Sequence, residues 1–166
     1  MKRSVLFLLV IFGLAGCTSG MYHPAQEEKT WQVQTTSAQV AENAYFSARI
    51  DSDCRNDLGC MSLRLQITNK SDRKLEVNWL NTYYLYNGRR EGTFMPIGKT
   101  DIGAPDIIGP KGSFMKFIFP DRLATVDKTG KWSRAAMKPG KNGVALSVKV
   151  DGREINEILV LELKKP

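Results

Sequence analysis

The chain has 166 residues, a formal net charge of +7 and a single histidine, His23. His23 lies in the polar N-terminal segment that we expect to be a tether, so a folded domain after it would have no histidine for Ser-His-Asp or Cys-His catalysis. A single histidine also excludes every metal site that needs several histidines. The lysines and arginines are scattered with no run of five, so the excess of positive charge does not indicate a nucleic-acid-binding protein.

Residues 1–16 have the layout of a secretory signal peptide. Lys2 and Arg3 precede an apolar stretch from Val5 to Phe12, and small residues follow it. The apolar run of about 12 residues is too short for a membrane-spanning helix, which needs about 20. We therefore expect a cleaved leader, and the remaining chain is long enough for one domain with a hydrophobic core.

The leader ends in the sequence LAGC, which is formed by Leu14, Ala15, Gly16 and Cys17. This motif resembles the lipobox of bacterial lipoproteins. The resemblance implies that Cys17 becomes the first mature residue and carries an acyl anchor that binds the membrane. Thr18 stands where an inner-membrane lipoprotein of Gram-negative bacteria often has aspartate, and the absence of aspartate implies the outer membrane. We expect the periplasmic face of that membrane rather than the cell surface. The alternative is an ordinary secreted protein with a chance cysteine near its cleavage site.

Residues 17–43 are predicted to form the acylated cysteine and a polar tether. Within them, "WQVQTTSAQVAENA" at 31–44 is ambiguous, because it fits either an edge strand around Trp31–Thr35 or a short helix after Ser37. The folded domain is predicted to span residues 44–166.

Cys54 and Cys60 are the two cysteines that remain after Cys17. In an oxidising compartment such a pair is expected to form a disulfide, which would staple a turn before a strand. A zinc site is a poor alternative without a nearby histidine, and a redox motif would need two intervening residues rather than five.

From Tyr45 onward the apolar residues alternate with polar ones, which predicts half-buried strands. Asn87-Gly88 and Asp151-Gly152 each predict a tight hairpin turn. The alternating segments and turn signals predict an all-β domain of about seven to nine antiparallel strands, arranged as a β-sandwich. The alternating strands are Phe46–Ile50, Leu63–Ile67, Leu75–Trp79 and Val144–Val150, and the apolar segment Ile158–Leu163 is predicted to close the chain as a further strand.

Residues 63–79 join two alternating strands through an Asn-x-Ser turn, and this pattern resembles many bacterial immunoglobulin-like domains. The resemblance implies a single immunoglobulin-like β-sandwich. The Cys-Trp-Cys arrangement of such cores is absent, because both cysteines precede Trp79.

No motif in the sequence predicts a cofactor or a metal. The phosphate-binding loop needs four residues between its glycines, but Gly92 and Gly98 enclose five. The acidic segment 51–57 lacks the glycine that a calcium loop requires. Asp101 and Asp106 share a long loop and are the pair that a glycosidase mechanism could use, although nothing in the sequence makes them face each other.

The segment "YYLYNGRREG" is the best candidate for a partner-binding surface. Tyr84 and Tyr86 share one face of an extended strand, and Arg89 and Arg90 follow the turn. Tyrosine and arginine are enriched at binding hot spots. The alternative is that these tyrosines only fill and edge the sheet.

We therefore expect a lipid-anchored binding or assembly module without catalytic activity, which contacts the membrane through its anchor and an envelope protein through its folded domain. The alternatives are a periplasmic inhibitor or immunity lipoprotein, and a cell-wall hydrolase that uses paired carboxylates.

Overall fold

The structure is a computed structural model, and it describes residues 31–34, 36–55, 58–99, 101 and 103–165. The predicted signal peptide, the lipobox with Cys17 and the histidine His23 lie outside these residues. Within the described part, no helix is long and apolar enough to cross a membrane.

The fold consists almost entirely of β-strands, as the alternating sequence predicts. In chain order the strands are β1 (Gln32–Gln34), β2 (Val40–Glu42), β3 (Phe46–Arg55), β4 (Gly59–Asn69), β5 (Leu75–Val77), β6 (Tyr83–Tyr86), β7 (Arg89–Pro96), β8 (Asp106–Ile108), β9 (Ser113–Pro120), β10 (Ala124–Val126), β11 (Trp132–Arg134), β12 (Gly140–Val150) and β13 (Arg153–Lys164). Three short 3-10 helices accompany them: η1 (Ser37–Gln39), η2 (Trp79–Asn81) and η3 (Asp121–Leu123).

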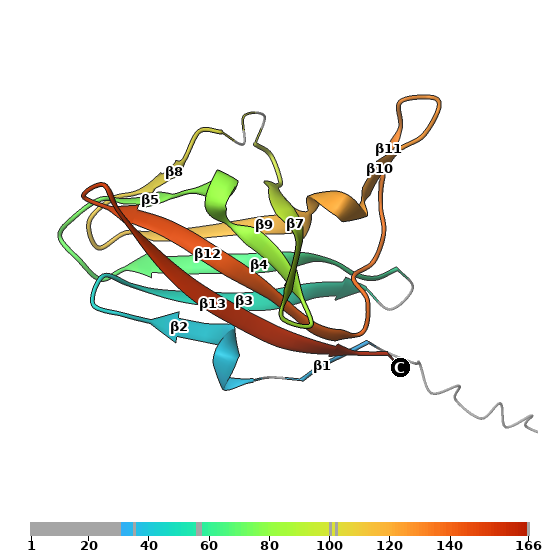
Figure 1. Cartoon of the computed structure of the whole chain (residues 1–166), viewed down its shortest axis with the longest axis horizontal. Helices are drawn as coiled ribbons and strands as arrows, with labels where there is room; N and C mark the ends of the chain where they lie inside the picture. The colour runs from blue at the N-terminus through green and yellow to red at the C-terminus, as the bar shows by residue number, and fades with distance from the viewer. Residues whose placement is uncertain (1–30, 35, 56–57, 100, 102, 166) are drawn as a thin grey trace, which may run out of the picture.

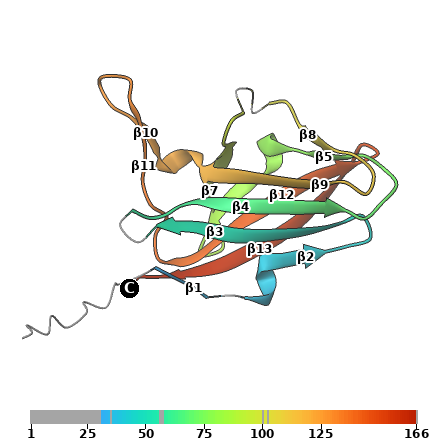
Figure 2. The same ribbon diagram turned by 180° about the vertical axis from the view of Figure 1, so that it is seen from behind.

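Eleven strands form one antiparallel sheet in the order β1-β13-β12-β6-β7-β9-β4-β3-β2, with β5 paired to β12 and β8 paired to β5. The sheet curls so that β12 and β13 lie across from β3 and β4 (Figures 1 and 2). Strand β7 joins the two layers, because it pairs with β6 on one side and with β9 on the other. The all-β antiparallel prediction is confirmed, and the immunoglobulin-like topology stays a prediction.

The described residues contain more strands than the predicted seven to nine. Six of the strands, β1, β2, β5, β8, β10 and β11, have only three residues each. Three residues are too few to show an alternating pattern, so most of these strands were invisible to the sequence argument.

The core lies between the two layers, where the alternating residues were expected to point. Phe46 and Ile50 from β3, Leu65 from β4, and Leu146 and Leu159 from β12 and β13 are fully buried. The buried polar side chains are also satisfied: within the described residues, no buried side-chain nitrogen or oxygen lacks a hydrogen-bond partner.

The ordered domain begins upstream of the predicted boundary at residue 44. β1 pairs with the end of β13, and β2 pairs with β3. The side chain of Gln39 is buried in between and donates to the carbonyl of Ile50 over 3.1 Å. An edge strand and a short helix therefore both occur in 31–44. Backbone pairing holds the exposed β1 at the edge, so apolar alternation could not reveal it.

Both predicted hairpin turns are present. Asn87 and Gly88 have φ angles of 49° and 79°, and Asp151 and Gly152 have φ angles of 49° and 77°. Two consecutive positive φ angles are what a type I′ turn requires. The first turn joins β6 to β7, and the second joins β12 to β13.

Candidate functional site

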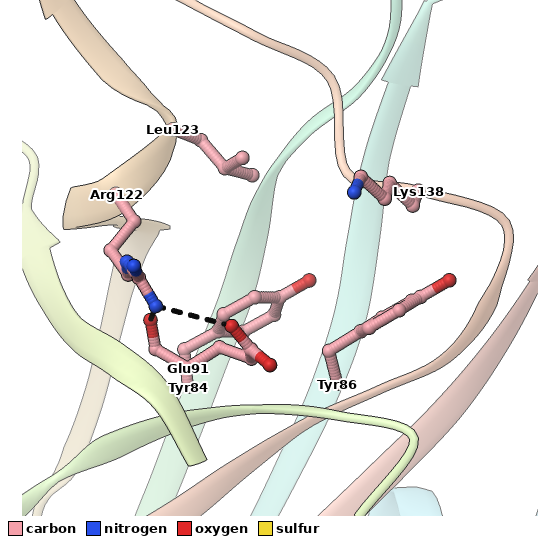
Figure 3. Close-up of a pocket in the computed structure, with 6 residues that line it drawn as sticks. All are labelled: Tyr84, Tyr86, Glu91, Arg122, Leu123 and Lys138. Atoms are coloured by element: carbon pink, nitrogen blue, oxygen red, sulfur yellow. Dashed lines mark hydrogen bonds and ion pairs between the residues drawn. The ribbon is translucent and has the colours of Figure 1, made fainter. Parts of the chain in front are cut away.

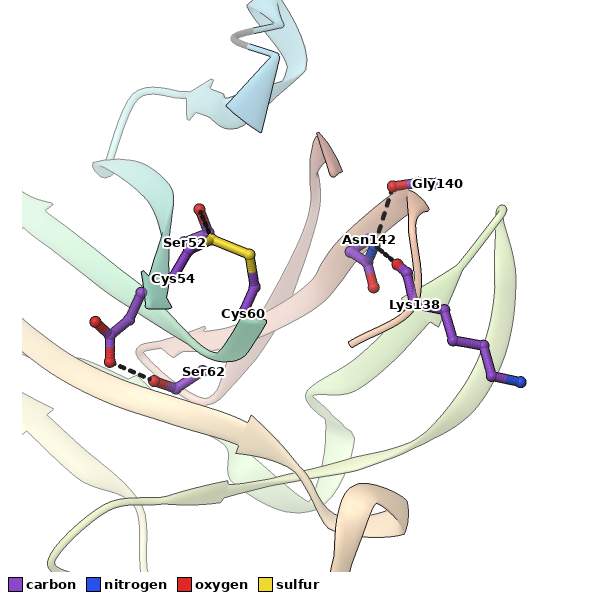
Figure 4. The surroundings of a disulfide bond; sticks show 8 residues. Ser52, Cys54, Cys60, Ser62, Lys138, Gly140 and Asn142 are labelled. Atoms are coloured by element: carbon purple, nitrogen blue, oxygen red, sulfur yellow. Dashed lines mark hydrogen bonds between the residues drawn. A yellow bond between two sulfur atoms is a disulfide. The ribbon is translucent and has the colours of Figure 1, made fainter. Parts of the chain in front are cut away.

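The predicted disulfide joins Cys54 to Cys60 at the turn end of the β3–β4 hairpin (Figure 4). The two cysteines lie directly opposite each other, with their Cα atoms 3.9 Å apart. Cys60 is fully buried at the edge of the core. The bond therefore staples the turn that precedes β4, as expected.

Next to this hairpin end, β10 and β11 form a two-stranded ribbon that projects from the body of the molecule (Figures 1 and 2). We call residues 124–134 the arm. Its base is fixed by two backbone bonds of 2.8 Å: Ala135 donates to the carbonyl of Leu123, and Met137 donates to the carbonyl of Cys60. A third bond at 2.9 Å runs from the buried Asn142 amide to the carbonyl of Lys138 (Figure 4).

The tip of the arm is organised around one carboxylate. Asp127 accepts hydrogen bonds from the hydroxyl and backbone amide of Thr129 and from the backbone amide of Lys131. The hydroxyl of Thr129 is the main reason why the pKa of Asp127 lies below its ordinary value. Gly130, with φ of 81°, completes the turn. These bonds give the projecting tip a defined conformation.

A groove of about 850 Å³ runs between the arm and the sheet. We call it the arm groove. Three segments line it: the stapled β3–β4 end, the β7–β9 region, and the arm. The lining residues are Asp53, Arg55, Met61, Ser62, Met95, Pro96, Ile97, Gly98, Lys99, Phe117, Phe119, Trp132, Ser133 and Arg134.

The arm groove exposes large apolar side chains that a folded domain usually buries. Trp132 is 61% exposed, Ile97 is 38% exposed and Phe117 is 36% exposed. On the arm, Trp132 stands opposite the half-exposed Val126. Clustered apolar surface of this kind marks interaction sites more often than scattered single residues do.

Positive charge borders the apolar lining. The guanidinium carbon of Arg134 lies 4.4 Å from the ring centroid of Phe119, a cation–π contact that links the arm to the sheet. Lys99 shares the carboxylate of Asp106 with Lys116, at 3.3 Å and 2.9 Å. Two ammonium groups on one carboxylate leave an excess positive charge at this side of the groove.

Asp106 is held in its ionised form. Burial alone would raise its pKa, but hydrogen bonds from Lys116, the Trp79 indole and Lys99 together outweigh burial and lower the pKa. A general acid needs a raised pKa, so Asp106 is unsuited to the acid role in a glycosidase pair. Asp101 instead accepts the backbone amide of Gly103 over 2.8 Å.

The four residues of the predicted tyrosine–arginine surface lie in different environments in the structure. Tyr84 is buried, and its hydroxyl donates to the side-chain oxygen of Asn142, so Tyr84 belongs to the core. Burial also raises the pKa of the Tyr84 hydroxyl. Arg90 is exposed but sits 3.1 Å from the ring centroid of Tyr83, on the opposite face of β6.

Two other residues of the predicted surface, Arg89 and Tyr86, are at least partly accessible to solvent. Arg89 is exposed at the hairpin tip. Tyr86 is half-buried, and its hydroxyl donates to the carbonyl of Pro139 over 3.0 Å. Tyr84 and Tyr86 also line a smaller hollow of about 240 Å³, beside the Glu91–Arg122 ion pair (Figure 3). The four predicted residues therefore do not form one continuous displayed surface.

The sequence argument missed the arm groove. Its residues come from segments between Asp53 and Arg134 that are far apart in the chain, and only the fold brings them together. One signal was available: Trp132 stands in the polar segment "DKTGKWSR", where no core residue is expected.

Comparisons with known proteins give no relative from which a function could be transferred, since no family model, no curated protein and no solved structure matches the chain.

Proposed function

We propose that the protein is a lipid-anchored module of the bacterial envelope that binds a partner protein in the arm groove. The observation that carries this proposal is the exposed Trp132 on the arm, which lines the same groove as the exposed Phe117 and Ile97 of the sheet and as Arg134. Tryptophan and arginine are among the residues that contribute most to protein interfaces. The fixed base and ordered tip of the arm support it further, because a preorganised surface loses less entropy on binding.

The anchor is the second part of the proposal. The LAGC motif supports acylation of Cys17, and Thr18 supports location in the outer membrane, where we place the domain at the periplasmic face. The segment 18–30 would separate the anchor from the first described strand, and a chain of that length spans at most about 45 Å. A module held so close to a membrane meets envelope partners at a high effective concentration, so a modest interface suffices.

A pull-down from chemically cross-linked envelopes tests the groove. Phe117→Asp and Trp132→Ala should each lose the partner that the wild type captures, and melting temperatures should confirm that both variants fold. Leu80→Asp is the matched control, because Leu80 is 55% exposed and lies outside the groove. Capture that is unchanged in both groove variants would refute binding at this site.

Membrane fractionation tests the anchor separately. Cys17→Ser should move the protein from the membrane fraction to the soluble fraction. A membrane-bound fraction equal to that of the wild type would show that Cys17 carries no anchor.

A periplasmic inhibitor or immunity lipoprotein is the second candidate, and the projecting arm favours it. A rigid hairpin held by Asp127 has the form needed to enter and block the cleft of an enzyme. The two candidates differ in the effect on the captured partner. An inhibitor reduces the partner's enzymatic activity in proportion to the complex formed, whereas an assembly module leaves the partner's activity unchanged.

A further inference from the structure

The charge distribution of the arm groove indicates what kind of partner segment it accepts, an inference that rests on the proposed function. The groove is lined by three basic side chains, Arg55, Lys99 and Arg134, against one acidic side chain, Asp53. Asp53 already accepts a hydrogen bond from the hydroxyl of Ser62 over 3.0 Å. The groove therefore presents positive charge to an occupant.

Arg134 is placed to bind a carboxylate. Its guanidinium carbon lies 4.4 Å from the centroid of the Phe119 ring, and a guanidinium has five N–H donors that can bind a carboxylate. Arg134 takes part in none of the ion pairs formed within the described part of the chain. A guanidinium that lies over a ring and forms no ion pair with the described acidic residues can pair with a carboxylate in bidentate geometry.

Lys99 supplies a second position for a negative charge. Its side chain is only 13% exposed and shares Asp106 with Lys116. The ammonium group has three donors, so the bond to Asp106 leaves capacity for another acceptor. One carboxylate cannot neutralise two ammonium groups, which makes a further carboxylate favourable there.

The apolar side chains that line the same groove set the other requirement. Phe117 and Ile97 are on the sheet side of the groove, and Trp132 is on the arm side. The arm groove lies between a ribbon and a sheet, and such a groove can accommodate an extended chain. The side chains of an extended chain point alternately to the two faces of that chain. A flat lipid surface has the negative charge but cannot enter such a groove.

We propose that the arm groove binds an extended segment of its partner protein in which acidic side chains are interspersed with bulky apolar ones. The apolar side chains pack between Phe117 and Trp132, and the carboxylates pair with Arg134 and Lys99.

The test uses the full chain in phosphatidylcholine nanodiscs and labelled decapeptides in a fluorescence anisotropy titration. One peptide alternates glutamate with phenylalanine and leucine. Two matched peptides replace every glutamate with lysine, or every apolar residue with serine. The first peptide should bind at least tenfold more tightly than either of the others.

Substitutions then assign the binding to the groove. Arg134→Glu should weaken binding of the acidic apolar peptide about tenfold, and Arg134→Lys should weaken it less. Arg153→Glu is the matched control, since it makes the same charge change at an exposed site outside the groove, and it should have little effect. Equal binding of the lysine peptide, or an equal loss in Arg153→Glu, would overturn the proposal.

Phosphatidylglycerol vesicles provide the competing outcome. If the peptide fails to bind but the vesicles bind in an Arg134-dependent manner, the groove contacts lipid and the proposal is wrong. If the pull-down described above succeeds while all peptides fail, only the inferred chemistry of the segment is overturned and the proposed function stands. Failure of the pull-down overturns both.

Discussion

The backbone amide of Met137 donates a 2.8 Å hydrogen bond to the carbonyl of Cys60. Cys60 is the buried partner of the disulfide, and Met137 is itself buried just beyond the end of β11. This bond connects the covalent staple to the base of the arm. We therefore expect the arm that carries Trp132 to be held in part by a disulfide that lies outside the arm.

Removal of the disulfide should loosen the arm as well as lower stability. Replacement of Cys54 and Cys60 by serine should lower the free energy of unfolding by about 2 kcal/mol, because the closed loop is short. In native-state hydrogen exchange, the Met137 amide should lose protection more than the Leu161 amide in β13 does. If the protection of Met137 falls only as much as that of Leu161, the disulfide does not hold the base of the arm in place.

A close approach at Gly59 also fixes the base of the arm. Gly59 has φ of 77°, and an added Cβ there would lie 2.9 Å from Cβ of Ala136. Gly88 has φ of 79° and open space around it, so Gly88→Ala carries nearly the same backbone strain without the clash. Gly59→Ala should therefore destabilise the protein more than Gly88→Ala in urea unfolding. Equal losses of unfolding free energy in the two variants would show that the chain after β11 moves aside for the added Cβ without cost.

The buried bond between Tyr84 and Asn142 should contribute measurably to stability. Tyr84→Phe removes the donor to a fully buried amide oxygen, which should cost about 1–2 kcal/mol. The control is Tyr83→Phe, which removes an exposed hydroxyl bonded to Asn81. Chemical denaturation of both variants compares the two losses. Indistinguishable values would mean that Asn142 finds another donor.

Asp106 should make stability depend on pH in acid. Its pKa is lowered in the folded state, so its contribution is complete above the unfolded pKa of about 3.9 and is lost as the pH falls through the lower folded pKa. Between about pH 5 and pH 2, the wild type should lose more free energy of unfolding than Asp106→Asn. Parallel pH profiles for the two proteins would contradict the charge cluster around Asp106.

The sequence predicted those parts of the molecule that local physics determines. Alternation located Phe46–Ile50 and Leu63–Ile67 correctly, because each strand buries one face. The Asn87-Gly88 turn and the Cys54–Cys60 pair were also predictable, since both depend on residues close in the chain.

The candidate site could not be predicted in the same way. Tyr84 and Tyr86 share a face of β6, but only the packing of β12 and the chain after the arm determines that this face turns inward. Phe117 and Trp132 line the same groove because η3 and β10 lead the chain from the end of β9 into the projecting arm (Figure 1). No local pattern encodes that course of the chain.

Site-specific photo-crosslinking in living envelopes tests the central claim most directly. A benzophenone side chain would replace Phe117 in the groove, Arg89 at the β6–β7 tip, or the exposed Leu80 as a control outside both sites. The account predicts one discrete protein adduct from position 117, its loss in the Trp132→Ala background, and no such adduct from positions 89 and 80. An adduct from position 89 with none from position 117 would place the partner at the hairpin tip and contradict binding in the arm groove.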